Sequence, residues 1–363
     1  MIKGVLKYFV ICFGLLINLS SDIDESRKTC IQANNIFLGI DSLTEGAGGS
    51  SYRDFFFLNS DLPRVGYLPI NYADIKALGI SSFVSKGMKW FSSDFTYGTF
   101  PKRLSVDGKG LFTNNGNNDK CILYISKLNY NRKIRLYYLK QPDGGTFKIS
   151  VTRNKKDSKG YFINTESKSL GIGYVEIFSQ NSSSLNVYNI YGKVALFGVY
   201  FKNESCQKDI VNSLAKGGVK MNDIANLDRD FRREWFRILK PTLYILNAGM
   251  NDRKTVKPRV FERNLKDYIA DIGYGAPNCK IILVEPNESK DYLNTFMPKY
   301  REIRCHISMI NSQVFYYSIP ENIGDYSFFK NKNLMLDDQH PNKKGNIIVG
   351  KALFTFSKKL NSN

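Results

Sequence analysis

The feature that most constrains the fold is an alternation of strand-like and helix-like segments from about residue 204 onward. We expect strands at TLYILN, KIILVEP and VFYYSI, and helices at DIVNSLAKGG, RVFERNLKDYIADI and GNIIVGKALFTFSKKL. Strands that alternate with helices form a parallel sheet covered on both faces. The apolar run at residues 36–40 and a helix at about residues 52–58 fit the same sheet, so the sequence predicts an α/β fold.

Between about residues 86 and 203 the pattern changes to short strands separated by turn residues such as QPDGG and QNSSS. The strands are expected at KCILYIS, KIRLYYL, TFKISVT, YFINT, YVEIFS, LNVYNI and VALFGVYF. This pattern is typical of an all-β sandwich. Because α/β sequence flanks it on both sides, we expect residues 86–203 to be an insertion between two parts of one α/β domain, residues 31–85 and 204–361.

The N-terminus has the pattern of a secretory signal. Lys3 and Lys7 form a basic start, and the apolar stretch YFVICFGLLI that follows is too short to span a bilayer comfortably. We therefore expect residues 1–21 to be a signal peptide, removed near Ser20 or Ser21, and the mature chain to be periplasmic or associated with the cell envelope. Cleavage would leave no stable membrane insertion; an uncleaved anchor is the alternative.

The chain is strongly basic, with 52 Lys and Arg against 33 Asp and Glu and a net charge of +19. Such a charge attracts polyanions. The lysines are scattered and no nucleic-acid-binding motif is present, so a nucleic-acid partner is not predicted. Anionic envelope polymers or membrane surfaces fit an exported chain better, and a lysine-rich composition without a specific partner is the alternative.

The sequence contains only two histidines, which narrows the search for a general base. His340 lies in LDDQHPNKKG, three residues after Asp337, and one local turn can bring the two side chains together. The carboxylate would then fix the imidazole while its other nitrogen faces a nucleophile. An exposed loop histidine is the alternative. His306 lacks such a partner and is expected to pack on a helix.

Two further polar residues follow predicted strands. Ser42, in IFLGIDSLTEGAGG, comes where a nucleophile could project, although taken alone the position favours a cap of the next helix. Asn251, in ILNAGMNDR, would stand at the C-terminal end of a parallel strand, the edge where open α/β sheets place their sites. Its side-chain N–H could stabilise an oxyanion, or it could belong to an ordinary turn.

Together, Ser42, the Gly-x-Asn-Asp segment and the Asp-x-x-His segment resemble, in their order, the SGNH or GDSL-type serine hydrolases. The resemblance implies a flavodoxin-like domain in which Ser42 is the nucleophile and Asp337 and His340 complete a triad. The oxyanion hole would consist of the Ser42 amide, the Asn251 side chain and a glycine amide, placed at Gly218 with Gly217 as the neighbouring candidate. No metal or organic cofactor is implied.

A narrower resemblance rests on PRVGYLP after the serine and LFGVYF at the end of the β-rich stretch. These segments are similar to bacterial peptidoglycan O-acetylesterases, in which the inserted module resembles a family 35 carbohydrate-binding module. The resemblance implies an O-acetylated glycan substrate, specifically the 6-hydroxyl ester of N-acetylmuramic acid in peptidoglycan. It leaves two alternatives. One is a polysaccharide O-acetyltransferase with the same triad. The other is an inactive glycan-binding protein, favoured by Ile40 where the family usually has glycine. The oligomeric state is not predicted.

Overall fold

The computed structural model describes residues 34–40, 42–45, 51–58, 64–70, 81–84, 88–90, 100–125, 132–153, 156–179, 182–203 and 209–361. All of them belong to one structural unit, Ala33–Asn363. The predicted signal peptide, residues 1–21, lies outside the described residues. Within the described residues, no helix combines the length and the apolar character that a membrane crossing requires.

A six-stranded parallel sheet, here called sheet A, has the order β16-β15-β14-β1-β13-β2. Its strands are β1 (Asn35–Ile40), β2 (Arg64–Val65), β13 (Ile210–Ser213), β14 (Leu243–Asn247), β15 (Lys280–Glu285) and β16 (Val314–Ser318). Apart from the two-residue edge strand β2, the order along the sheet is second, first, third, fourth, fifth. This is the flavodoxin-like order.

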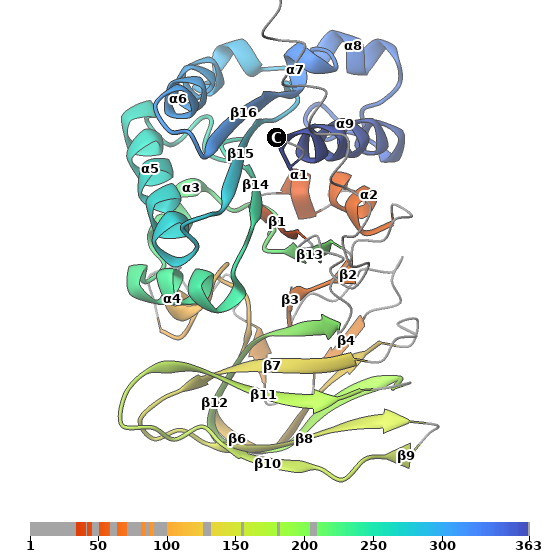
Figure 1. The fold of residues 1–363 in the computed structure, drawn as a ribbon, viewed down its shortest axis with the longest axis vertical. Helices are drawn as coiled ribbons and strands as arrows, with labels where there is room; N and C mark the ends of the chain where they lie inside the picture. The colour runs from red at the N-terminus through yellow and green to blue at the C-terminus, as the bar shows by residue number, and fades with distance from the viewer. Residues whose placement is uncertain are drawn as a thin grey trace, which may run out of the picture. The chain divides into compact units, whose positions relative to one another are not determined.

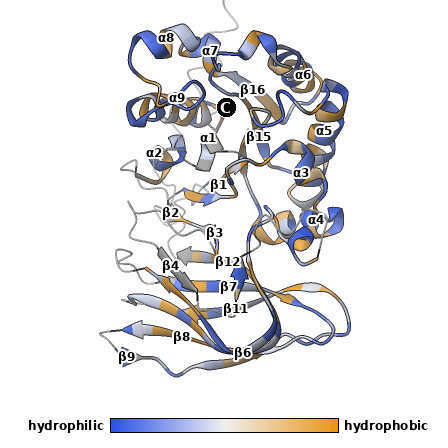
Figure 2. Ribbon diagram, turned by 180° about the vertical axis from the view of Figure 1, so that it is seen from behind, coloured by the Kyte–Doolittle hydropathy of each residue, from blue (hydrophilic) through white to orange (hydrophobic). Residues whose placement is uncertain are grey.

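Helices cover both faces of sheet A. The described helices are α1 (Ser42–Glu45), α2 (Tyr52–Leu58), α3 (Met221–Ala225), α4 (Arg229–Leu239), α5 (Pro258–Gly275), α6 (Met297–Met309), α7 (Ile319–Asn322), α8 (Tyr326–Asn331) and α9 (Lys343–Asn361). Figure 1 shows α4, α5 and α6 on one side of the sheet and α2 and α9 on the other. Figure 2 shows hydrophobic and hydrophilic residues alternating along α5 and α6. Such amphipathic helices bury one stripe against a sheet.

The strands of sheet A are apolar on both faces because both faces are covered. Ile36 and Leu38 of β1 pack in the cluster that includes α2 and α9, whereas Phe37 packs in the cluster that includes α4, α5 and α6. Successive side chains of a strand point to opposite faces. The near-continuous apolar runs of the sequence therefore reflect a sheet buried between two helical layers.

One predicted element is wrong: DIVNSLAKGG was expected to be helical, but Ile210–Ser213 is strand β13, which pairs in parallel with β1. Asn212 and Ser213 resembled the polar face of a helix. Both are buried instead, and Asn212 Nδ2 donates to Asn35 Oδ1 at 2.7 Å and to the Ile36 carbonyl at 3.0 Å. Buried polar side chains with partners of this kind are compatible with a central strand.

The other described strands form sheet B, in which every pairing is antiparallel. They are β3 (Tyr67–Pro69), β4 (Ser81–Val84), β5 (Lys89–Trp90), β6 (Leu111–Tyr124), β7 (Arg132–Lys140), β8 (Thr146–Arg153), β9 (Lys156–Asp157), β10 (Tyr161–Asn164), β11 (Gly171–Phe178) and β12 (Ser184–Asn203). The predicted strands LNVYNI and VALFGVYF are one strand, β12. It pairs with β8 through its first half and with β7 through its second half.

Sheet B curls, as Figure 1 shows for the strands around β12. Register shifts in the pairing of β12 with β6 are consistent with this curvature, because β-bulges bend a strand. β3 and β4 belong to sheet B although they precede residue 86. The description of residues 86–203 as a sandwich-type insertion remains a prediction.

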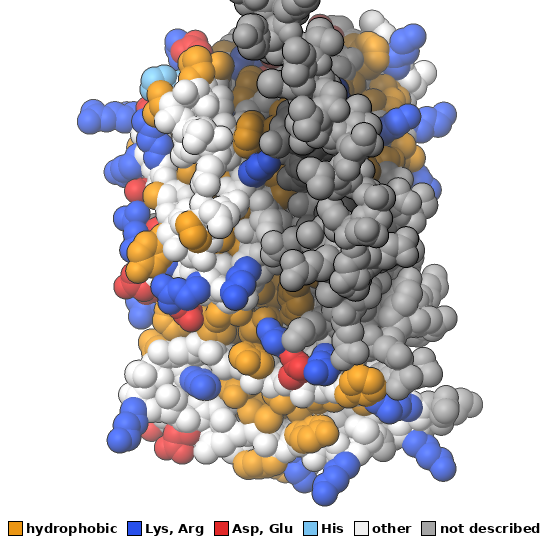
Figure 3. Space-filling model, in the orientation of Figure 1, with side chains coloured by type: hydrophobic (Ala, Val, Ile, Leu, Met, Phe, Trp, Pro, Cys, Tyr) orange, Lys and Arg blue, Asp and Glu red, His pale blue; other side chains and the backbone are white. Residues whose placement is uncertain are grey.

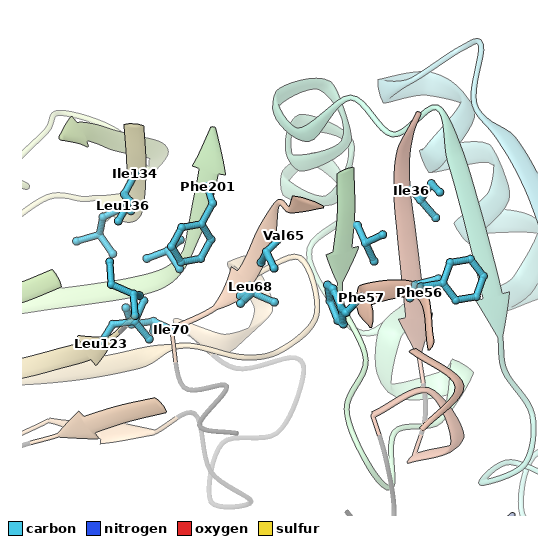
Figure 4. Close-up of a cluster of buried hydrophobic side chains, with 14 of the residues drawn as sticks. Ile36, Phe56, Phe57, Val65, Leu68, Ile70, Leu123, Ile134, Leu136 and Phe201 are labelled. Atoms are coloured by element: carbon cyan, nitrogen blue, oxygen red, sulfur yellow. The ribbon is translucent and has the colours of Figure 1, made fainter. Parts of the chain in front are cut away.

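The chain passes between the two sheets at a single glycine. Gly66 lies between β2 of sheet A and β3 of sheet B; its N–H donates to the Val211 carbonyl at 2.8 Å, and its carbonyl accepts from Phe201 N–H at 3.1 Å. Gly66 therefore lies beside both the end of β12 in sheet B and the start of β13 in sheet A. A cluster of buried hydrophobic side chains continues across this junction, from Ile36 to Phe201 (Figure 4).

Candidate active site

The candidate site lies at the C-terminal ends of β13, β1 and β14, which are neighbours in sheet A. The order of strands reverses between β1 and β14, and open α/β sheets bind ligands at such a switch point. β1 ends at Ile40 and the backbone of Ser42 begins α1. Asp41 and the hydroxyl of Ser42 lie outside the described part of the structure.

β1 extends to Ile40, which stands where the SGNH-type hydrolases that the sequence resembles usually have glycine. Ile40 pairs with Asn247 of β14 and its side chain is buried. The glycine stands one residue earlier, at Gly39, where a Cβ atom would lie 2.5 Å from the Tyr244 hydroxyl. Gly39 is therefore required for close packing of β1 against β14, and Ile40 prolongs the strand by one residue.

His340 and Asp337 form a hydrogen-bonded pair. His340 Nδ1 lies 2.9 Å from Asp337 Oδ2 and 3.1 Å from Oδ1. Asp337 Oδ1 also accepts the backbone N–H groups of Gln339 and His340, each at 2.7 Å. Partial burial acts to raise the pKa of Asp337, but these hydrogen bonds and the imidazole outweigh it, so the pKa is lowered. An ionised carboxylate against Nδ1 favours the tautomer in which Nε2 is the basic atom.

The loop that carries this pair is closed by backbone hydrogen bonds. Leu336 N–H donates to the His340 carbonyl at 2.8 Å, and Met335 forms an isolated antiparallel bridge with Pro341. Asn342 then caps α9, because its Oδ1 accepts the N–H groups of Lys344 and Gly345 at 3.0 and 3.1 Å. The histidine therefore sits directly before a capped helix.

Packing of α9 against α2 brings together two helices that are far apart in the sequence. Phe354 of α9 makes edge-to-face contacts with Phe55 and Phe56 of α2, at ring-centroid distances of 6.1 and 5.5 Å. α2 is tied to α1 by the Thr44 and Tyr52 hydroxyls, which lie 2.6 Å apart. The helix that begins at Ser42 and the helix that follows His340 thus belong to one packed unit.

The Asn251 side chain contacts the loop that carries Gly218. Asn251 Nδ2 donates to the Val219 carbonyl at 3.0 Å, next to Gly218. Gly218 has φ +76°, a left-handed conformation that favours glycine. An amide group carries two N–H donors, so Asn251 can hold the Val219 loop with one and present the other to a ligand. This contact brings the predicted Gly218 and Asn251 segments together.

Asp252 strengthens the link between these loops. Its carboxylate is buried, and both oxygens lie 3.0 Å from the Met221 backbone N–H at the start of α3. Burial raises the pKa of Asp252 to about 6, against the effect of the backbone hydrogen bonds from Met221 and Asn222. The side chain thus connects the loop after β14 to the segment that follows Gly218.

His306 is not part of this arrangement. It lies on α6 with its side chain exposed, and Asp337 is the carboxylate that contacts His340. Asp338 instead accepts a hydrogen bond from the Tyr326 hydroxyl at 2.9 Å. Among the described residues, no group of three or more His, Cys, Asp or Glu side chains is arranged to hold a metal ion.

Sequence reasoning missed the residues that support these loops. Arg304 is buried on α6 and donates to the Ala248 carbonyl just after β14. Glu285 is buried at the end of β15, and Asn287 follows it in the next loop. The signal in the sequence was the polar stretch after KIILV, since side chains at the C-terminal ends of parallel strands face the site edge.

The chain matches no protein-family model and no curated protein. It is similar to a solved structure of a peptidoglycan O-acetylesterase, with a TM-score of 0.68, 15% identity and 92% of each chain covered. A family two carbohydrate esterase from Clostridium thermocellum, solved with cellohexaose, has a TM-score of 0.32 and 12% identity over 77% of this chain and 98% of that one.

The likeness to the first structure concerns the fold. It confirms the predicted fold class, a flavodoxin-like α/β domain combined with an antiparallel β region. It also confirms, at the level of the fold, the resemblance to peptidoglycan O-acetylesterases.

Proposed function

We propose that the protein is an exported carbohydrate esterase that removes O-acetyl groups from a cell-envelope glycan. The specific substrate is the acetyl ester at the 6-hydroxyl of N-acetylmuramic acid in peptidoglycan. The observation that carries the proposal is the Asp337–His340 pair, 2.9 Å apart, in the loop before the helix that packs against α2. The likeness in fold to a peptidoglycan O-acetylesterase supports the choice of substrate class.

In the proposed reaction, His340 Nε2 removes the proton from the Ser42 hydroxyl as its oxygen attacks the acetyl carbonyl carbon. The negative charge that develops on the carbonyl oxygen is stabilised by the Ser42 and Gly218 amides and by the Asn251 side chain. Collapse of this intermediate breaks the ester bond, and the imidazolium gives its proton to the departing sugar oxygen, which leaves as a hydroxyl group. Water, activated by His340, then attacks acetyl-Ser42 and releases acetate.

Export and location belong to the same proposal. Residues 1–21 would direct the chain out of the cytoplasm, and the mature enzyme would act in the periplasm or at the cell envelope, where its glycan substrate is found. The reaction requires no metal or organic cofactor.

The test measures acetate released from O-acetylated peptidoglycan by the purified protein, its Ser42→Ala variant and a control, Ser169→Ala, at an exposed serine of the β region. We expect Ser42→Ala to lose at least about a thousandfold in rate while remaining folded, because a nucleophile cannot be replaced. Ser169→Ala should match the wild type. Near-normal turnover by Ser42→Ala would refute the serine mechanism.

Acceptor sugars are added in a parallel reaction to separate the alternatives. Acetylated acceptor formed in place of free acetate would identify an acetyltransferase. Glycan binding without any acetate release would identify an inactive binding protein.

A further inference from the structure

The His340–Asp337 pair is partly open to water, chiefly at Asp337. The Asp337 side chain is 52% exposed and that of His340 is 20% exposed. Exposed ion pairs and hydrogen bonds contribute little stability because water competes for both partners. The orientation of the pair must therefore depend on the loop backbone and on whatever fixes that backbone from outside.

The segment after β15 contacts this backbone between the two members of the pair. The Asn287 side chain donates from Nδ2 to the Gln339 carbonyl at 2.9 Å, and Lys290 N–H donates to the Asp338 carbonyl at 3.0 Å. Asn287 is only 2% exposed and Gln339 is half-buried, so their hydrogen bond is partly shielded from water. A buried hydrogen bond is costly to lose because the remaining polar group keeps no solvent partner.

The end of β15, two residues before Asn287, is anchored by a buried carboxylate, that of Glu285. Glu285 accepts from Tyr292 Oη at 2.7 Å, Arg301 Nε at 2.6 Å, Tyr316 Oη at 2.5 Å and Ser318 Oγ at 2.6 Å. Burial acts to raise the pKa of Glu285, but these hydrogen bonds lower it, so the group is an anion in the folded protein. The end of β15 is thereby fixed to β16 and α6.

We propose that Asn287 is a positioning residue that holds the Asp337–His340 loop in register by donating to the Gln339 carbonyl. The effect of Asn287 on catalysis rests on the proposed esterase function, whereas the effect of Asn287 on the geometry of His340 does not. Asn287 touches neither Asp337 nor His340, and it acts on them through the backbone that lies between them.

The sequence contains only two histidines, so this role can be measured directly by NMR. In protein labelled with ¹⁵N-histidine, the ring nitrogens of His340 report whether Nδ1 carries the proton and is hydrogen-bonded. The exposed His306 on α6 provides an internal reference in the same spectrum. A structural defect that spreads through the molecule would change both histidines, whereas loss of positioning would change only His340.

The main variant is Asn287→Asp, which keeps the size of the side chain and replaces the donating NH₂ by an oxygen. Asn287→Ala is the second variant. If one of these two variants fails to fold, Asn287→Ser takes its place. Asn322→Asp is the matched control, because Asn322 Nδ2 also donates to a backbone carbonyl, that of Ser318, at 2.7 Å. Asn322 is exposed on α7.

In both Asn287 variants we expect the His340 Nδ1 signal to move toward that of an imidazole averaging between tautomers, with His306 unchanged. On a small acetyl ester, kcat should fall about tenfold with little change in KM, as expected for a lost buried hydrogen bond that orients the base. Asn322→Asp should keep the His340 signals and a kcat within about twofold of the wild type.

A folded Asn287 variant with unchanged His340 signals and unchanged kcat would overturn the positioning role. A change in His340 together with a wild type that hydrolyses no acetyl ester would refute the proposed function and leave the positioning role intact. A change in both histidines would overturn the proposal as well, since it would indicate a general structural effect.

Discussion

Asp252 is a single residue whose ionisation opposes folding. Its carboxylate is buried, and burial raises its pKa to about 6 from the ordinary value of 3.8. A carboxyl group whose pKa is raised by folding binds its proton more tightly in the folded state. Its stabilising contribution is therefore complete below about pH 4 and is lost as pH rises through about 6. Each pKa unit corresponds to about 1.4 kcal/mol, so the loss amounts to about 3 kcal/mol.

We predict that Asp252→Asn weakens the pH dependence of stability, because asparagine does not ionise. Between about pH 4.5 and pH 7.5 the free energy of unfolding of the wild type should fall by about 2 kcal/mol more than that of the variant, because part of the full effect is already lost at pH 4.5. Urea unfolding at both pH values measures the difference. Asp107→Asn provides a comparison, since burial also raises the pKa of Asp107 to about 6. Parallel pH profiles for wild type and Asp252→Asn would contradict the prediction.

Contacts between residues a few positions apart could be predicted from the sequence. Contacts between residues that only the fold brings together could not. Asp337 and His340 are three positions apart, so one turn brings them together, and the structure shows that contact. Asn287 lies 52 positions from Gln339, and its contact depends on where two loops meet at one edge of sheet A. The polar stretch after KIILV places Asn287 at the site edge of the sheet, but it does not indicate that this side chain contacts Gln339.

At the scale of elements, the α2–α9 contact links the predicted nucleophile to the predicted base. We predict that Phe354→Ala lowers the free energy of unfolding by about 2 kcal/mol, because it removes ring contacts with Phe55 and Phe56. Thermal unfolding measures this loss. Esterase kcat should also fall, since α9 begins three residues after His340.

Thr355→Ala is the matched control for Phe354→Ala, because Thr355 is the next residue on α9 and is exposed. It should leave both stability and kcat close to the wild-type values. A fall in stability with unchanged kcat in Phe354→Ala would show that the α2–α9 contact supports the fold without fixing the site.

The strand-and-helix pattern identified most elements of sheet A, and its failure at β13 has a physical cause. Hydrophobic periodicity identifies strands such as β14. All five residues of this strand are buried, and all except Asn247 are apolar. In β13 the residues Asn212 and Ser213 are buried but polar, and they are satisfied by partners from β1, α2 and the start of β3. Hydrophobic periodicity does not register a polar residue whose partners come from other segments.

On the scale of the whole molecule, the dominant property is the excess of basic residues. The chain carries a net charge of +19, and Figure 3 shows Lys and Arg side chains spread over the visible face, both above and below, with fewer acidic ones between them. Some of them form ion pairs: the buried Asp271 carboxylate contacts Arg229, Arg232 and Arg233. A spread of positive charge attracts a polyanion at long range without creating one specific binding site.

If this charge concentrates an anionic cell-wall glycan, the rate on polymeric peptidoglycan should fall as ionic strength rises. Exposed charges are screened beyond about 10 Å at 0.1 M salt, so the long-range attraction weakens while contacts within the site persist. A neutral chromogenic acetate should scarcely respond, because its reaction with Ser42 depends on His340 and the oxyanion donors alone. Measuring both rates across a salt series in one enzyme preparation therefore separates attraction from chemistry. Equal salt sensitivity for both substrates would indicate a general effect on the enzyme, and no sensitivity for either would mean that the basic composition does not recruit the substrate.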